Sequence, residues 1–166
     1  MPNLPDSPDW TVRGLALPPA LISLLRTGGW VHPGQQALAR LMPWFEDPLW
    51  FMPDLREMRR ENGALDSLAD DGELFRLTRG GHPDRRLDPS WLDVDLAVLI
   101  AVNERAGDDV GVALDYRTDP ADPRVVAADI WTDLTRYSWR LVTATFTELL
   151  TALGVAGSDR PAPDSR

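Results

Sequence analysis

Acidic side chains are the commonest groups in this chain that could take part in acid–base chemistry, and two of them are adjacent. Asp108 and Asp109 lie in a polar stretch between two apolar runs. Neighbouring side chains in a turn point apart, and aspartates in turns usually hydrogen-bond nearby backbone or water. We therefore interpret this pair as turn residues and not as a general acid and base.

Metal ligands are the next possibility, because oxygen ligands suit calcium. The candidates are Asp119, Asp122 and Asp129, but their spacing does not match the EF-hand loop, and the first two precede proline. His32 and His82 also precede proline and are too few for a zinc site. The chain contains no cysteine and therefore no thiolate ligand, thiol nucleophile or disulfide. The sequence predicts neither a metal site nor a cofactor.

Nucleophiles and phosphate-binding loops give no stronger pattern. The serines at positions 23, 67, 90 and 138 lie in no G-x-S-x-G motif. The glycine pairs at 28–29 and 80–81 lack the spacing of a phosphate-binding loop. A hydrolase would need a pocket of converging ionisable groups, which the sequence does not indicate. We predict that the chain is not an enzyme.

Aromatic residues offer a binding surface instead. The chain has seven tryptophans, and two of them, Trp44 and Trp50, flank the acidic residues Glu46 and Asp47. One interpretation places both indoles in the core, where the N–H finds a carbonyl. The alternative leaves one partly exposed as an anchor for a partner, since tryptophan is enriched at binding hot spots.

A second candidate surface lies in the stretch 96–117, where two runs of alternating side chains meet across a polar loop. This period of two predicts an antiparallel hairpin. Its bulky face must be covered by helices, and its other face is lined mostly by alanine and glycine. The bulky face consists of Leu96, Val98, Ile100, Val102, Val110, Val112, Leu114 and Tyr116, and the small one of Ala97, Ala101, Gly111 and Ala113, with Leu99, Asp115 and Arg117 as exceptions.

Asp115 and Arg117 occupy alternate positions on that small-residue face. They can pair with each other or satisfy loop backbone; if they face a groove, they offer a partner peptide one acceptor and one forked donor. The predicted partner-binding residues are Trp44, Asp47, Trp50, Asp115 and Arg117.

Several other elements must position these residues. Apolar spacing predicts helices over 20–26, 34–42 and 54–62, the last closed by Asn62-Gly63. A final helix begins at a capping box formed by Thr145 and Glu148 and ends at Gly154. Strands are predicted at 49–51, 124–128 and 139–142. The signals over 64–92 are mixed: 65–77 is compatible with a partial helix, and we expect a long surface loop. This order predicts an α+β domain whose mainly antiparallel sheet is a meander packed against helices.

Length and charge set further limits. With 166 residues and 43% hydrophobic side chains, one domain can bury a sizeable core. We expect a loosely ordered segment over 1–14 and a disordered tail over 156–166. The net charge of −9 argues against nucleic-acid binding and favours a basic protein partner. No signal peptide or membrane span is predicted, so we expect a cytoplasmic protein.

The order of elements and several short motifs resemble the second half of the SUKH superfamily, which includes bacterial toxin-immunity proteins and fungal cell-wall-synthesis regulators. The resemblance is carried by Gly107-Asp108-Asp109, the 114–117 motif LDYR, the strand start at 123–126 and the helix containing Phe146. It covers 91–154 well and 18–62 more weakly, whereas 64–90 falls outside it. It implies an α+β domain over 15–155 that binds other proteins without catalysis.

Two functions follow from this resemblance. The first is an immunity protein that binds and neutralises a toxin domain, for which the acidic balance suits a cationic effector. The alternative is an intracellular regulatory or scaffold module with no toxin partner. A neighbouring gene for a secreted protein that ends in a toxin domain would favour the first.

Overall fold

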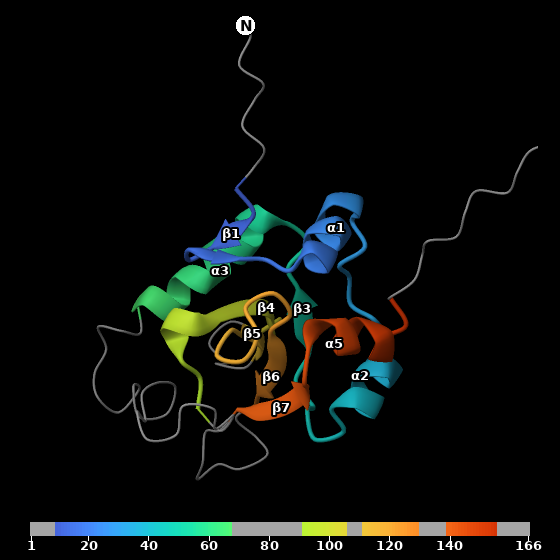
Figure 1. The fold of residues 1–166 in the computed structure, drawn as a ribbon. Helices are drawn as coiled ribbons and strands as arrows, with labels where there is room; N and C mark the ends of the chain where they lie inside the picture. Colours follow the sequence, from blue (N-terminus) through green and yellow to red (C-terminus); the bar gives the residue numbers. More distant parts are fainter. Residues whose placement is uncertain (1–8, 68–90, 106–110, 130–138, 156–166) are drawn as a thin grey trace, which may run out of the picture.

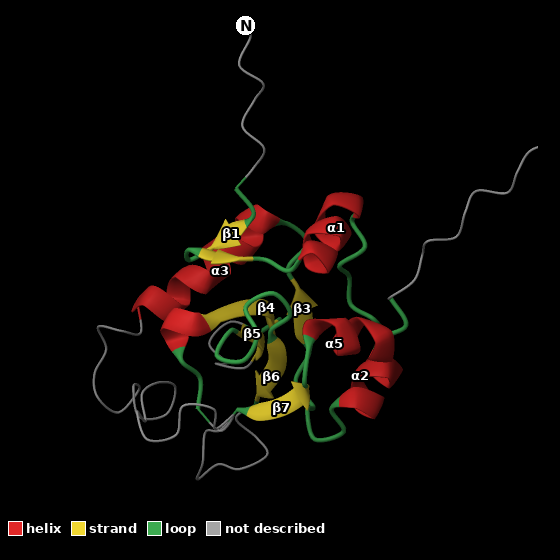
Figure 2. Ribbon diagram, viewed as in Figure 1, coloured by secondary structure: helices red, strands yellow, loops and turns green. Residues whose placement is uncertain are grey.

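The computed structural model describes residues 9–67, 91–105, 111–129 and 139–155, and it shows an α+β fold (Figures 1 and 2). The predicted fold class is therefore confirmed. In chain order the elements are β1 (Thr11–Val12), β2 (Leu15–Ala16), α1 (Pro19–Thr27), α2 (Gln35–Leu41), β3 (Leu49–Phe51), α3 (Leu55–Ser67), the 3₁₀-helix η2 (Val94–Leu96), β4 (Ala97–Asn103), β5 (Gly111–Asp115), β6 (Arg124–Ala128), β7 (Arg140–Thr143) and α5 (Phe146–Ala152).

The main sheet has five strands in the order β3-β4-β5-β6-β7, and each neighbouring pair is antiparallel. The strands that follow one another from β4 to β7 form the predicted meander. Helices α1, α2 and α5 lie together beside this sheet, and α3 contacts β1 and β4 (Figure 1). In the described part of the chain, no helix is both long and apolar enough to cross a membrane.

The hairpin of β4 and β5 differs from strict alternation at one position. Ala97, Val98 and Leu99 pair with Asp115, Leu114 and Ala113, but the register then shifts, and Ala101 pairs with Val112. An extra residue in one strand turns the following side chains to the other face. Ala101 therefore lies on the bulky face and Val102 on the small-residue face, opposite to the prediction for both. The alternation could not show this, because almost every residue of β4 is apolar.

The bulky face is covered by helices and by the segments between them. Trp30, in the link between α1 and α2, contacts Phe51 with ring centroids 4.9 Å apart and Phe146 at 5.9 Å. Its indole N–H donates to the carbonyl of Ile100, 3.1 Å away, where the register of β4 shifts. The bulge is thus held by a buried hydrogen bond from the helical layer.

Helix α3 is longer than predicted, because Asn62-Gly63 does not end it. The Asn62 side chain is fully buried, and its amide donates to the carbonyls of Met58 and Leu99, each at 2.8 Å. Its carbonyl oxygen also accepts from the N–H of Leu99 at 2.7 Å. These hydrogen bonds hold Asn62 inside the helix. Gly63 has a negative φ and not the left-handed conformation that would end the helix there.

The N-terminal prediction also needs correction where the structure describes it. The sequence predicts a loosely ordered segment over 1–14, but β1 pairs with β2, and Val12 is fully buried. A buried apolar side chain and the strand pairing fix this segment. The stretch over 64–92 is helical up to Ser67, within the part for which the sequence left a partial helix open, and Trp91 and Leu92 are buried. The rest of that prediction, with the tail over 156–166, lies outside the described residues.

Candidate functional site

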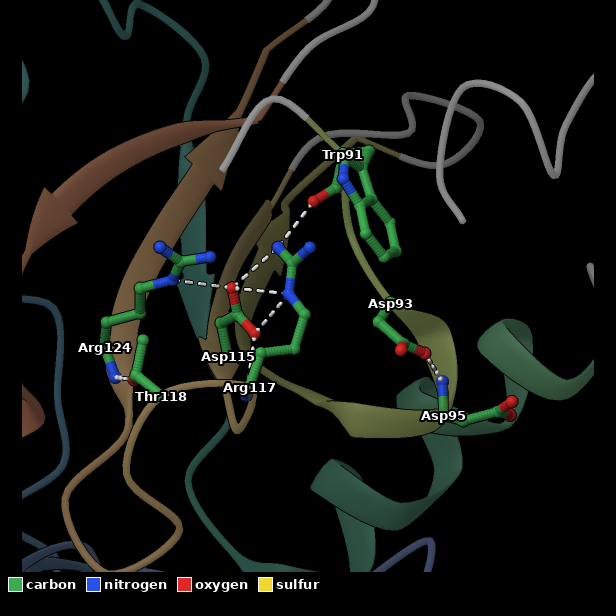
Figure 3. A network of polar contacts seen from close by, with 7 residues as sticks. All are labelled: Trp91, Asp93, Asp95, Asp115, Arg117, Thr118 and Arg124. Carbon is green, nitrogen blue, oxygen red and sulfur yellow. Dashed lines mark hydrogen bonds and ion pairs between the residues drawn. The ribbon is translucent and has the colours of Figure 1, made fainter. Parts of the chain in front are cut away.

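The most concentrated polar group in the described residues is a buried cluster at one end of the sheet (Figure 3). Asp115 is the last residue of β5 and pairs in register with Arg124, the first residue of β6. Arg124 Nε donates to Asp115 Oδ2 at 2.8 Å. Arg117 donates to the same carboxylate from Nε at 2.9 and 3.1 Å and from Nη2 at 2.8 Å. One carboxylate thus binds two guanidinium groups.

Trp91 joins this cluster from the segment that precedes β4. Arg117 Nη2 donates to the Trp91 carbonyl at 2.7 Å, and the guanidinium carbon lies 4.2 Å from the centre of the Trp91 ring. The Arg117 backbone N–H also donates to Asp115 Oδ1 at 3.1 Å. The cluster of Trp91, Asp115, Arg117 and Arg124 therefore ties the segment before β4 to the β5–β6 connection, and we name it the arginine clamp.

Burial and charge act in opposite directions on Asp115. Its side chain is inaccessible to solvent, and burial by itself raises the pKa of the carboxyl group. The hydrogen bonds and positive charge of Arg117, with the hydrogen bond from Arg124, outweigh that effect and hold the pKa of Asp115 below its ordinary value. The carboxylate is therefore charged at neutral pH.

The donors of the arginine clamp exceed its acceptors. Arg117 Nη1 and Arg124 Nη2 are buried and make no hydrogen bond. The side chains of Arg117 and Arg124 are only 4% and 10% exposed. Two guanidinium groups and one carboxylate leave a net charge of +1 inside this cluster.

Acidic side chains surround the same end of the sheet at the surface. Asp93 and Asp95 lie at η2, which leads into β4, and Asp119 and Asp122 lie in the β5–β6 connection. Asp95 and Asp119 are exposed, and Asp93 and Asp122 are half-buried. We name these four residues, with the 38%-exposed Leu96 that follows Asp95, the acidic rim.

Local hydrogen bonds fix the acidic rim. Asp93 accepts from the N–H of Asp95 at 3.1 Å, and Asp119 from the N–H of Ala121 at 2.9 Å. Asp122 accepts from the N–H of Thr147, in the first turn of α5, at 3.0 Å. In addition, the Arg13 side chain donates to the carbonyls of Val94 and Ala97. Each part of the rim is thus attached to the folded body.

The first predicted surface, around 44–50, lies elsewhere. Trp44 and Trp50 are half-buried, as the anchor alternative requires, whereas Asp47 is only 7% exposed. Trp44 packs against Phe45, with ring centroids 5.7 Å apart, and the guanidinium carbon of Arg140 lies 4.7 Å from the centre of its ring.

The five predicted residues therefore do not form one surface. Asp115 and Arg117 pair with each other inside the arginine clamp, which is the structural alternative weighed from the sequence. Trp50 pairs with Val102, which in turn pairs with Gly111 at the other end of β5. Trp50 and Asp115 share a face of the sheet, but strand β4 lies between their strands, and they are about 13 Å apart along the strand direction.

The candidates for metal and acid–base chemistry are also separated. Asp119 and Asp122 precede β6 and Asp129 follows it, a separation of about 16 Å along the strand. Within the described ranges, no group of three or more His, Asp or Glu side chains is placed to share a metal ion. His32 Nδ1 accepts from the N–H of Gly34 at 3.0 Å. Asp108, Asp109, His82, Ser90, Ser138 and the glycines at 80–81 lie outside the described residues.

Sequence reasoning missed Arg124, Trp91 and the η2 half of the acidic rim. Arg124 had a detectable signal: if 111–115 and 124–128 are paired as an antiparallel meander, Asp115 and Arg124 face each other. Trp91 had no such signal, because its contact with Arg117 spans 26 positions and depends on the fold.

Comparison with known proteins gives no relative from which to transfer a function. No family model, curated protein or solved structure matches the chain.

Proposed function

We propose that this chain is a non-catalytic protein-binding domain and that it acts as an immunity protein, which binds and neutralises a toxin domain with a basic surface. The acidic rim is the observation that carries the proposal. It gathers four carboxylates and one exposed leucine at one end of the sheet, in a chain with a net charge of −9.

The chemistry of the rim suits a cationic protein. The four negative carboxylates attract a basic surface over a Debye length of about 8 Å in physiological salt, and this attraction speeds association. Leu96, which follows Asp95 in the chain, adds an exposed apolar side chain to these charges. Protein interfaces combine such an apolar centre with a polar border.

The arginine clamp has a positioning role in this proposal. Its side chains are nearly buried, so they add little surface to the rim itself. They join Trp91, which lies two residues before Asp93, to the β5–β6 connection that carries Asp119 and Asp122. The clamp therefore fixes the two halves of the rim relative to each other. Trp44 and Trp50 are candidates for a second contact region.

The first experiment identifies the partner. Tagged chain is purified from the native cell, the bound proteins are identified, and the gene is deleted from cells exposed to the toxin domain encoded next to it. The proposal expects deletion to abolish protection. If deletion leaves protection unchanged and the bound protein is an intracellular regulator, the regulatory or scaffold alternative replaces it.

The second experiment tests the surface. The double variant Asp95→Lys/Asp119→Lys should weaken binding to the identified partner by about tenfold or more, mainly through a slower association rate. Glu104→Lys is the control, since Glu104 is exposed just after β4, at the opposite end of the sheet. Surface plasmon resonance at two salt concentrations measures both variants. Equal affinities for the double variant and the wild type would refute the role of the rim.

A further inference from the structure

The buried donors of the arginine clamp lack an acceptor. Arg124 uses Nε for Asp115 and makes no hydrogen bond through the buried Nη2. Arg117 uses Nε and Nη2 and leaves Nη1 without an acceptor. A buried donor without an acceptor costs about 1–3 kcal/mol, and more when it is charged.

The terminal nitrogens of Arg124 have the geometry for a forked acceptor. The guanidinium group presents Nη1 and Nη2 side by side, which matches the two oxygens of a carboxylate. Asp115 holds this group through Nε, and neither terminal nitrogen of Arg124 bonds that carboxylate (Figure 3). The Arg124 side chain as a whole is 10% exposed, so solvent reaches part of it.

Charge limits the kind of anion that fits. The three charged groups of the clamp sum to +1, which a single carboxylate neutralises. A phosphate dianion would leave a net negative charge close to the four aspartates of the acidic rim. We propose that the end of the Arg124 guanidinium group, held by Asp115 and beside Arg117, is a binding site for one carboxylate group. This site is distinct from the acidic rim and does not depend on the proposed toxin partner.

The carboxylate could belong to a small organic acid or to the end of a polypeptide, and the experiment separates these sources. Acetate is titrated into the full chain at constant ionic strength with chloride as the replaced anion, and the ¹⁵N signals of the arginine side chains are followed by NMR. A second titration uses an acetylated tripeptide with a free C-terminal carboxylate, and a third uses the same tripeptide amidated.

The proposal expects saturable shifts of the Arg124 side-chain signals with acetate or with the free tripeptide. Shifts with acetate indicate that the site binds a small organic acid. Shifts with the free tripeptide alone indicate that it binds the C-terminal carboxylate of a polypeptide. The amidated tripeptide should have no effect. Absence of saturable shifts with both carboxylates would overturn the proposal, and so would an equal response to the amidated peptide.

Variants test the residue itself. Arg124→Gln should weaken carboxylate binding by about tenfold or more, because the forked, charged donor is lost. Arg40→Gln, an exposed arginine near the end of α2, should bind like the wild type. Circular dichroism checks that each variant is folded. If Arg124→Gln does not fold, Arg124→Lys keeps the charge without the fork and should also bind more weakly. Unchanged binding in the folded variant would refute the site.

Discussion

At the scale of single residues, Asp115 has the most demanding environment. Its carboxylate is inaccessible to solvent and binds two arginines that are themselves nearly buried. Removing one partner of a buried ion pair leaves an uncompensated charge, which is more costly than never having had the pair. Asp115 therefore stabilises the fold mainly by supplying the negative charge that Arg117 and Arg124 both bind.

Asp115→Asn should lower the free energy of unfolding by about 3–5 kcal/mol at pH 7. The folded-state pKa of Asp115 is lowered, so its contribution is fully present above the unfolded-state pKa of about 3.9 and is lost as the pH falls through the folded-state value. The difference between wild type and variant should therefore shrink in acid. Urea unfolding at pH 7 and near pH 3, followed by circular dichroism, measures it.

The control for this prediction is Asp95→Asn, which removes an exposed carboxylate of the acidic rim. Surface substitutions of this kind usually change stability by less than about 0.5 kcal/mol. A loss in Asp115→Asn as small as in Asp95→Asn, or one independent of pH, would contradict the role given to the buried carboxylate.

At the scale of elements, Asn62 joins α3 to β4. Strand β3 pairs with β4 only from Ala101 to Asn103, so Leu99 lies beyond the end of β3. The Asn62 side chain takes the place of a neighbouring strand there, because it bonds both the N–H and the carbonyl of Leu99. Buried backbone groups need such partners.

Asn62→Leu should lower the free energy of unfolding by about 2–4 kcal/mol, because it leaves the backbone N–H and the carbonyl of Leu99 without the partners that Asn62 supplies.

Gly63→Ala, at the next position, should instead raise the free energy of unfolding. Gly63 is helical, and an added Cβ meets no atom within 4 Å. Alanine should therefore stabilise α3 by about 0.5–1 kcal/mol. Thermal unfolding of both variants tests the pair, and a destabilised Gly63→Ala would mean that α3 ends there after all.

Helix α3 and strand β4 also show which features of the fold the sequence can predict and which it cannot. Alternation and proline placement locate β3, β5 and β6 because those signals are local. The bulge in β4 and the length of α3 depend on Trp30 and Asn62, whose partners lie 70 and 37 positions away. Local patterns therefore predict the elements, whereas buried polar contacts between distant segments decide where they bend and end.

The candidate site follows the same division. The pairing of Asp115 with Arg117 is among the sequence alternatives because the two residues occupy alternate positions of the predicted strand. Arg124 becomes part of the site only through the pairing of β5 with β6. The separation of Trp50 from Asp115 needed the complete strand order.

At the scale of the whole molecule, Trp30 connects parts of the chain from both halves of the sequence. It lies in the link between α1 and α2, and it contacts β3 through Phe51, α5 through Phe146 and β4 through Ile100. Only 3% of its surface is exposed. The helices and the sheet therefore share one core, and a change at Trp30 should be felt in all of these elements.

Trp30→Phe keeps an aromatic ring but removes the indole N–H, so the Ile100 carbonyl loses its donor. We expect a loss of about 2–3 kcal/mol in the free energy of unfolding, from the unsatisfied carbonyl and the smaller ring. Amide hydrogen exchange should show equally weakened protection in β4 and α5, because both belong to one cooperative unit. Val31→Ala is the matched control, since Val31 is the next residue and 60% exposed. Loss of protection confined to β4 would show instead that the sheet and the helices unfold separately.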